Sequence, residues 1–279
     1  METIGFISII IIIANLIVSY KGFSDRNFYA RYSFEVEKIL IYKDYKRLIT
    51  SGFLHVNWMH LIFNMLALYF FSGSLESYIG PVYYLIIYFS SLIGGELLSL
   101  FIHKNQGDYG SVGASGAISG IIFASIALFP GMRIGMLFLP ISLPAWLFGL
   151  LYILYSIYGI RSKRDNIGHE AHLGGAMIGM LLAICLEPDA LMQNYIYILI
   201  IAIPTLAFIY LIITRPHILL IDNLFYNKHK DYYSIDHKYN EKKNNQQQDI
   251  DKILDKISKR GINSLSQKEK QMLKDFSKK

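Results

Sequence analysis

The chain has 279 residues, of which 53% are hydrophobic and only 17% are charged, and its formal net charge is +6. This composition excludes an ordinary soluble domain of this size and predicts a protein that crosses a membrane several times. The single cysteine, Cys185, excludes a disulfide within the chain.

Seven apolar segments follow one another along the sequence. A helix needs roughly 20 apolar residues to cross a hydrocarbon core about 30 Å thick. We expect the first segment to be retained as a span, because no basic residue precedes it and no small-residue cleavage site follows it. The fold class is therefore predicted to be all-α, a polytopic transmembrane helical bundle. Its spans are predicted at 4–20, 55–75, 81–102, 115–129, 143–160, 171–186 and 195–213.

The apolar density falls after residue 215. The segment that follows is rich in Asn, Gln and Lys, a composition typical of a flexible linker. Near the end, Ile250 to Ile257 repeat with helical spacing, and Ser266 and Glu269 form a capping box ahead of a second apolar run. We predict a membrane core over 1–190, an extra transmembrane helix over 191–215, a polar linker over 216–248 and a small amphipathic helical hairpin over 249–279.

The second predicted span carries polar side chains, which are costly inside a membrane and are therefore candidates for function. His60 and Asn64 are four residues apart and share one face of a helix. His55 lies about 140° around the helix from His60, so it serves another neighbour. By themselves, His60 and Asn64 fit either a functional site or hydrogen bonds that tie helices together.

The fourth predicted span, 115–129, is too short to cross the membrane, since about 15 residues give roughly 22 Å of helix. If its C-terminal end reaches one interface, its N-terminal end lies inside the membrane. Ser115 would then stand at the first turn of a helix, beside unpaired backbone N–H groups and the positive end of the helix dipole. This position favours stabilisation of an oxyanion.

Small residues predict that the fourth and sixth spans pack closely. Gly116 and Gly120 form one small-xxx-small face, and Gly175 and Gly179 form another just after His172. Close approach would bring His172 within reach of Ser115, so that the imidazole could accept the hydroxyl proton during attack on a carbonyl. No acidic residue is obviously placed to orient the imidazole, which predicts a Ser-His dyad.

These motifs together resemble the rhomboid family of intramembrane serine proteases over about two thirds of the chain. The resemblance rests on Arg47 in the first loop, on His55, His60 and Asn64 in the second span, on Gly113-x-Ser115-Gly116, and on the Ala-His-Leu-Gly-Gly run at His172. It implies a six-helix core, with Ser115 as nucleophile and His172 as general base. It also implies an oxyanion hole built from His60, Asn64 and the Ser115 backbone N–H.

The resemblance further implies transmembrane protein substrates, cleaved near small or helix-breaking residues within the lipid bilayer, and neither a metal nor another cofactor. The sequence departs from the family at Ser119, four residues after the nucleophile, where some members place a Tyr against the imidazole. It contains no nucleic-acid-binding motif. The oligomeric state and the identity of the substrate do not follow from the sequence.

Other classes of function compete with this hypothesis. A pseudoprotease of the same fold would bind membrane clients without cutting them. A proton-coupled transporter would use Glu96, near the middle of the third span, although a buried carboxyl can also simply tie helices together. A metalloprotease is disfavoured, because His169 and His172 are three residues apart and do not form the HExxH pattern.

The sidedness stays open. Lys and Arg gather in the first, third and fifth loops and in the tail, whereas Arg133 stands alone on the other side of a seven-span topology. The positive-inside rule then places the mouth of the Ser115 site toward the cytoplasm, while most bacterial relatives are expected to open it away from the cytoplasm. Either the last apolar run, 195–213, does not span, or this member opens its site toward the cytoplasm, or the charges of the first loop lie in the interface and do not direct insertion. We expect an integral, multi-pass protein of the bacterial cytoplasmic membrane.

Overall fold

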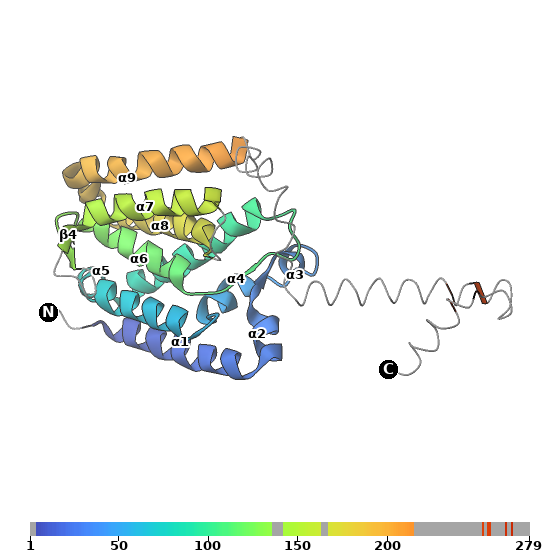
Figure 1. Cartoon of the computed structure of the whole chain (residues 1–279). Coiled ribbons are helices and arrows are strands. Elements are labelled where there is room, and N and C mark those ends of the chain that lie inside the picture. The colour runs from blue at the N-terminus through green and yellow to red at the C-terminus, as the bar shows by residue number, and fades with distance from the viewer. Residues whose placement is uncertain are drawn as a thin grey trace. The chain divides into compact units, whose positions relative to one another are not determined.

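The computed structural model describes residues 4–135, 142–162 and 167–214, together with Ile253, Lys256, Ile257, Ser266 and Glu269 of the tail. The chain divides into two compact units, Met1–Leu220 and Ile221–Lys279. The first unit is a bundle of helices with two short antiparallel strand pairs (Figure 1). The predicted linker over 216–248 lies outside the described residues.

The first unit begins with α1 (Phe6–Ser24) and continues into the long first loop, which contains more structure than the sequence indicated. This loop holds α2 (Arg26–Tyr32), β1 (Phe34–Glu35), α3 (Val36–Leu40), α4 (Arg47–Thr50) and the 3-10 turn η1 (Ser51–Phe53). Asp25 caps α2 by accepting the backbone N–H groups of Asn27 and Phe28, each at 3.0 Å. The first loop is therefore a folded segment that contains a capped helix and a strand.

The second and third predicted spans both lie within α5 (Trp58–Ile102). The helix is broken at Gly80, whose φ of 80° and ψ of 166° are not helical, and Pro81 follows directly. A left-handed φ suits glycine, and proline starts a helix well, so this pair turns the chain between two spans. The break therefore agrees with the predicted boundary between 75 and 81.

Strand β2 (Gly110–Ser111) leads into α6 (Ser115–Leu128) and pairs antiparallel with β1, with Phe34 opposite Ser111. Almost every side chain of α6 is buried. The helix is surrounded by α5, by α7 (Ala145–Ser162), by α8 (His169–Leu186) and by α9 (Pro188–Thr214), with α1 and α9 on opposite sides of the bundle (Figure 1). A second hairpin, β3 (Arg133–Gly135) with β4 (Ser142–Pro144), connects α6 to α7.

Length and apolarity allow five of the described helices to cross a membrane, namely α1, α5, α7, α8 and α9. The shorter α6 does not reach that length. This is the pattern of a helical membrane bundle, so the predicted fold class is confirmed. The helix α9 begins at Pro188, seven residues earlier than the predicted seventh span, because only Glu187 separates it from α8.

The tail shows the capping box that the sequence predicts. The backbone N–H of Ser266 donates to Glu269 Oε2 at 2.7 Å, and the backbone N–H of Glu269 donates to Ser266 Oγ at 3.3 Å. Glu269 also accepts hydrogen bonds from Lys256 Nζ at 2.8 and 2.9 Å. The bonds from Lys256 and Ser266 lower the pKa of the Glu269 carboxyl to about 2.

Candidate active site

Ser115 is the first residue of α6, as the sequence predicts. The preceding Gly113 has a φ of 135°, a value that side chains rarely adopt, and its backbone N–H donates to the Ser51 carbonyl at 3.0 Å. The first helical hydrogen bond runs from the Ile118 N–H to the Ala114 carbonyl. The N–H groups of residues 115 to 117 therefore have no partner within the helix, so the N-terminal end of α6 favours a negative charge.

His172 lies in the first turns of α8, and its Nε2 is 2.7 Å from Ser115 Oγ. This distance is that of a hydrogen bond between the hydroxyl and the imidazole. The two residues are 57 positions apart in the chain, so the packing of α8 against α6 alone creates the pair. The structure thus brings together the two residues of the predicted dyad.

The glycine faces make this packing possible. A methyl group at Gly175 would overlap the Gly116 carbonyl oxygen, and one at Gly179 would overlap the Gly120 backbone. A methyl group at Gly116 would stand 3.3 Å from the Ala171 carbonyl oxygen. Side chains larger than hydrogen would separate the two helices, so the predicted small-xxx-small contact is confirmed.

His60 lies beside the nucleophile. A Cβ at Gly113 would stand 2.8 Å from the His60 ring, which shows that the ring packs on the glycine just before Ser115. Asn57 caps α5 by accepting the His60 N–H at 2.9 Å, and Asn64 Nδ2 donates to the His60 carbonyl at 2.9 Å. His60 and Asn64 therefore share one face of α5, as predicted, and His60 is next to the start of α6.

His55 serves a different neighbour from His60, in agreement with its angular position. Its Nδ1 is hydrogen-bonded to Ser19 Oγ of α1 at 2.8 Å, and Ser19 Oγ also donates to the Phe53 carbonyl at 2.8 Å. The His55 ring meets the His60 ring edge to face, with centroids 4.9 Å apart. His55 thus links α1 to the back of His60.

Arg47 holds the first loop together. Its guanidinium donates to the carbonyls of Ala30 and Ser33, at 2.9 and 2.5 Å, and to Asp44 Oδ2 at 2.9 Å. One buried side chain thus joins the end of α2 to the turn before α4.

Carboxyl groups close to the site are engaged elsewhere. Glu96 accepts a hydrogen bond from Ser51 Oγ at 3.2 Å, and Ser51 is the residue whose carbonyl holds Gly113. Glu170, two residues before His172, lies 3.2 Å from His103 Nε2. Glu96 therefore supports the loop before the nucleophile, and Glu170 ties α8 to the end of α5.

One contact of His172 could not be predicted from the sequence. The ring of Tyr152, on α7, lies 5.8 Å from the His172 ring with an interplanar angle of 31°, and its hydroxyl is 2.7 Å from Ser119 Oγ. The sequence signals only an aromatic residue in an aromatic-rich helix. Nothing in its spacing indicates which helix face meets α8.

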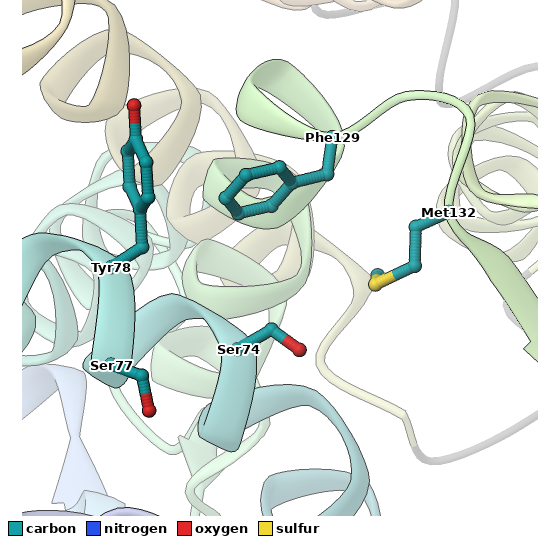
Figure 2. Close-up of a pocket in the computed structure, with 5 residues that line it drawn as sticks. All are labelled: Ser74, Ser77, Tyr78, Phe129 and Met132. Carbon is teal, nitrogen blue, oxygen red and sulfur yellow. The ribbon is translucent and has the colours of Figure 1, made fainter. Parts of the chain in front are cut away.

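A hollow of about 510 Å³ lies at the other end of α6, lined by Ser74, Ser77, Tyr78, Phe129 and Met132. Figure 2 shows Tyr78 next to Phe129, whose rings meet edge to face with centroids 5.1 Å apart, and Met132 on the loop that follows α6. Since Leu128 is about 20 Å along the helix from Ser115, this hollow is not part of the Ser115 site. Among the described residues, no three His, Cys, Asp or Glu side chains gather to hold a metal ion.

Comparison with known proteins agrees with this arrangement. The rhomboid domain model matches residues 42–188, a range that contains Arg47, His60, Asn64, Ser115 and His172. A second model, a family of unknown function (DUF6576), matches residues 233–279. The tail is therefore similar to a sequence family that is separate from the rhomboid domain.

Three curated relatives illustrate the similarity. RHOMBOID-like protein 12, mitochondrial, of Arabidopsis thaliana is 34% identical over 149 residues, which are 48% of this chain and 44% of the relative. Rhomboid protein 1, mitochondrial, of Saccharomyces cerevisiae is 35% identical over 150 residues, 51% of this chain and 43% of the relative. Presenilin-associated rhomboid-like protein, mitochondrial, of Homo sapiens is 30% identical over 139 residues, 48% of this chain and 36% of the relative.

The chain therefore spans less than half the length of these relatives. The domain match covers more than half of the chain itself and includes the helices that form the Ser115 site. This chain belongs to the rhomboid family of multi-pass membrane proteins.

Proposed function

We propose that the protein is an intramembrane serine endopeptidase that cleaves transmembrane protein substrates through the Ser115-His172 dyad. The observation that carries this proposal is the 2.7 Å hydrogen bond between Ser115 Oγ and His172 Nε2. A serine hydroxyl is a weak nucleophile unless a base accepts its proton, and an imidazole at this distance is such a base.

In the first step, Ser115 Oγ attacks the carbonyl carbon of the scissile bond and its proton passes to His172 Nε2. The tetrahedral intermediate collapses when the C–N bond breaks and the imidazolium returns the proton to the leaving amine. Water then attacks the acyl-enzyme with His172 again as the base, and this step releases the new carboxyl end and restores Ser115.

The oxyanion of the intermediate needs hydrogen-bond donors that are already in place. The backbone N–H groups at the start of α6 point along the helix axis away from the helix body, and the Ser115 N–H is the first of them. The His60 ring packs on Gly113 within the same region, and Asn64 follows one turn later on α5. We assign these three groups to the oxyanion hole, and none of them requires a metal or another cofactor.

The environment proposed for the reaction is the lipid bilayer. A helix of 14 residues, about 21 Å long, starts at the nucleophile, and α5, α7, α8 and α9 surround it. Such a helix can begin at membrane depth only where other protein segments enclose it. A transmembrane substrate segment would reach Ser115 from the bilayer after local unwinding.

The membrane that holds the protein stays a prediction. The sequence led us to expect the bacterial cytoplasmic membrane, whereas the curated relatives named above are mitochondrial proteins. Fractionation of the source cells, with antibody against the tail, identifies the membrane.

The deciding experiment uses the full chain reconstituted in liposomes with a model transmembrane substrate that contains a helix-breaking residue. We expect the wild type to cut it, and Ser115→Ala and His172→Ala to leave it intact. Ser125→Ala is the matched control, since Ser125 lies on the same helix and its Oγ only donates to the Ile121 carbonyl at 2.9 Å. If either dyad variant cleaves like the wild type, the proposal is wrong.

Substrate retention and solute flux, measured on the same liposomes, address the competing hypotheses. A pseudoprotease would retain the substrate without cutting it, whether or not Ser115 is present. A transporter would show solute flux that Glu96→Gln abolishes. The contact between Glu96 and Ser51 instead suits a tie between α5 and η1.

A further inference from the structure

Tyr152, on α7, contacts His172 directly and is linked to Ser115 through Ser119. Its ring lies beside the His172 imidazole at 5.8 Å between centroids, and Phe123 and Phe148 flank it at 5.7 and 6.2 Å. Aromatic neighbours on α6 and α7 thus fix the plane of the Tyr152 ring. That ring in turn limits the orientations that the imidazole can adopt.

The hydroxyl of Tyr152 reaches the nucleophile through a directed chain of hydrogen bonds. Ser119 Oγ donates its one hydrogen to the Ser115 carbonyl at 2.7 Å. The 2.7 Å contact between Tyr152 and Ser119 must therefore use the tyrosine hydrogen, with Ser119 Oγ as acceptor. The chain runs from Tyr152 to Ser119 to the backbone of Ser115.

Both contacts matter for the same geometric reason. The Ser115–His172 hydrogen bond joins two helices, so a rotation of the imidazole or a shift of the first turn of α6 would lengthen it. Ser119 faces the site one turn after the nucleophile, but its side chain is too small to cover the imidazole. Tyr152 supplies a ring to His172 and a donor to Ser119 from α7.

We propose that Tyr152 is a positioning residue of the dyad, whose ring holds the His172 imidazole and whose hydroxyl holds the first turn of α6. This inference rests on the proposed proteolytic function. Tyr152 takes no part in bond making, so its loss acts on the alignment of Ser115 and His172.

The test follows the rate at which a fluorophosphonate probe modifies Ser115. The Ser115 Oγ–P bond forms as the P–F bond breaks, fluoride leaves, and the serine proton passes to His172. The rate therefore reports the alignment of the dyad without knowledge of the natural substrate. Ser115→Ala gives the background, and cleavage of the model substrate supplies kcat and KM in parallel.

We expect Tyr152→Leu to slow modification by at least about tenfold and to lower kcat with little change in KM, because alignment and not binding is lost. Tyr152→Phe keeps the ring against His172, so it should recover most of the rate. Ser119→Ala should also slow modification. In the double variant Tyr152→Phe/Ser119→Ala, the combined loss should be smaller than the product of the single losses, because both changes break one chain.

The matched control is Leu154→Ala, which lies two residues away on the exposed, opposite face of α7 and should react like the wild type. Thermal midpoints of all variants separate misalignment from unfolding. If Tyr152→Leu unfolds, the Tyr152→Phe and Ser119→Ala variants decide whether the inference holds.

The inference alone is overturned if the wild type reacts and cleaves and the Tyr152 and Ser119 variants react at the same rate as the wild type. A wild type that neither reacts nor cleaves overturns the proposed function as well.

Discussion

The crossing of α6 and α8 offers a sharp test of how the dyad is assembled. Gly175 lies against the Gly116 backbone, one turn after His172 on the same helix. A methyl group there would overlap the Gly116 carbonyl oxygen, whereas an ordinary contact needs at least 3.4 Å. Because the obstacle is backbone and not a flexible side chain, Gly175→Ala must move the helices apart.

The expected loss of rate follows from the separation of the helices and from the length of the Ser115–His172 hydrogen bond. Restoring an ordinary contact requires a separation of roughly 1.4 Å, which takes the 2.7 Å bond between Ser115 Oγ and His172 Nε2 out of hydrogen-bond range. A displacement of this size can lower the rate about 100-fold. Overpacking should also lower the free energy of unfolding by about 1–3 kcal/mol.

The assay measures probe modification of Ser115 and the thermal midpoint in detergent. Gly168→Ala is the matched control, since Gly168 precedes α8 with a φ of −75° and a Cβ there meets nothing within 4 Å. This control should behave like the wild type in both measurements. A Gly175→Ala protein that reacts and melts like the wild type would refute the close helix contact from which the dyad geometry is argued.

Two further predictions concern stability away from the dyad. Glu76 accepts hydrogen bonds from the Ile7 N–H at 2.8 Å and the Ser8 N–H at 3.0 Å, so Glu76→Gln should cost about 1–3 kcal/mol of unfolding free energy. Probe modification of Ser115 should stay unchanged, because Glu76 is about 24 Å along α5 from His60; an unaltered thermal midpoint would contradict the role of Glu76. Burial acts to raise the pKa of Asp44, but hydrogen bonds from Arg47 and Lys46 outweigh it and hold the pKa below its ordinary 3.8. The stability from this pair should be complete above about pH 4 and fall with the pH below that, and Asp44→Asn should flatten the acid limb of unfolding free energy against pH, whereas identical limbs would count against the contribution of Asp44.

Several features of the fold could be predicted because they depend on local composition. Apolar length indicated the helices, and the break at Gly80 follows from a glycine and a proline between two apolar runs. The start of α6 at Ser115 follows from the glycine-containing loop before it. The capping box of Ser266 and Glu269 is a four-residue pattern and is present as expected.

Other features depend on contacts between distant segments. The short helices of the first loop were missed, and so was the pairing of β1 in that loop with β2 before α6, since each element is too short to show a periodic pattern. The link between Tyr152, Ser119 and His172 was missed because it depends on the rotation of α7 about its own axis. In an apolar membrane helix, the side that meets lipid and the side that meets protein have similar compositions. The sequence therefore does not indicate which side of α7 meets α8.

The sequence by itself determined the class of the protein, indicated the two residues of the proposed dyad and identified the glycine faces that allow two helices to meet. These follow from the membrane's demand for apolar length and from the rarity of polar groups within it. Only the tertiary structure decided that Ser115 and His172 share a hydrogen bond, that His60 packs beside Gly113, and that Tyr152 lies against His172 and Ser119. Distances between side chains on separate helices depend on how those helices cross and rotate, and no single segment of sequence contains that information.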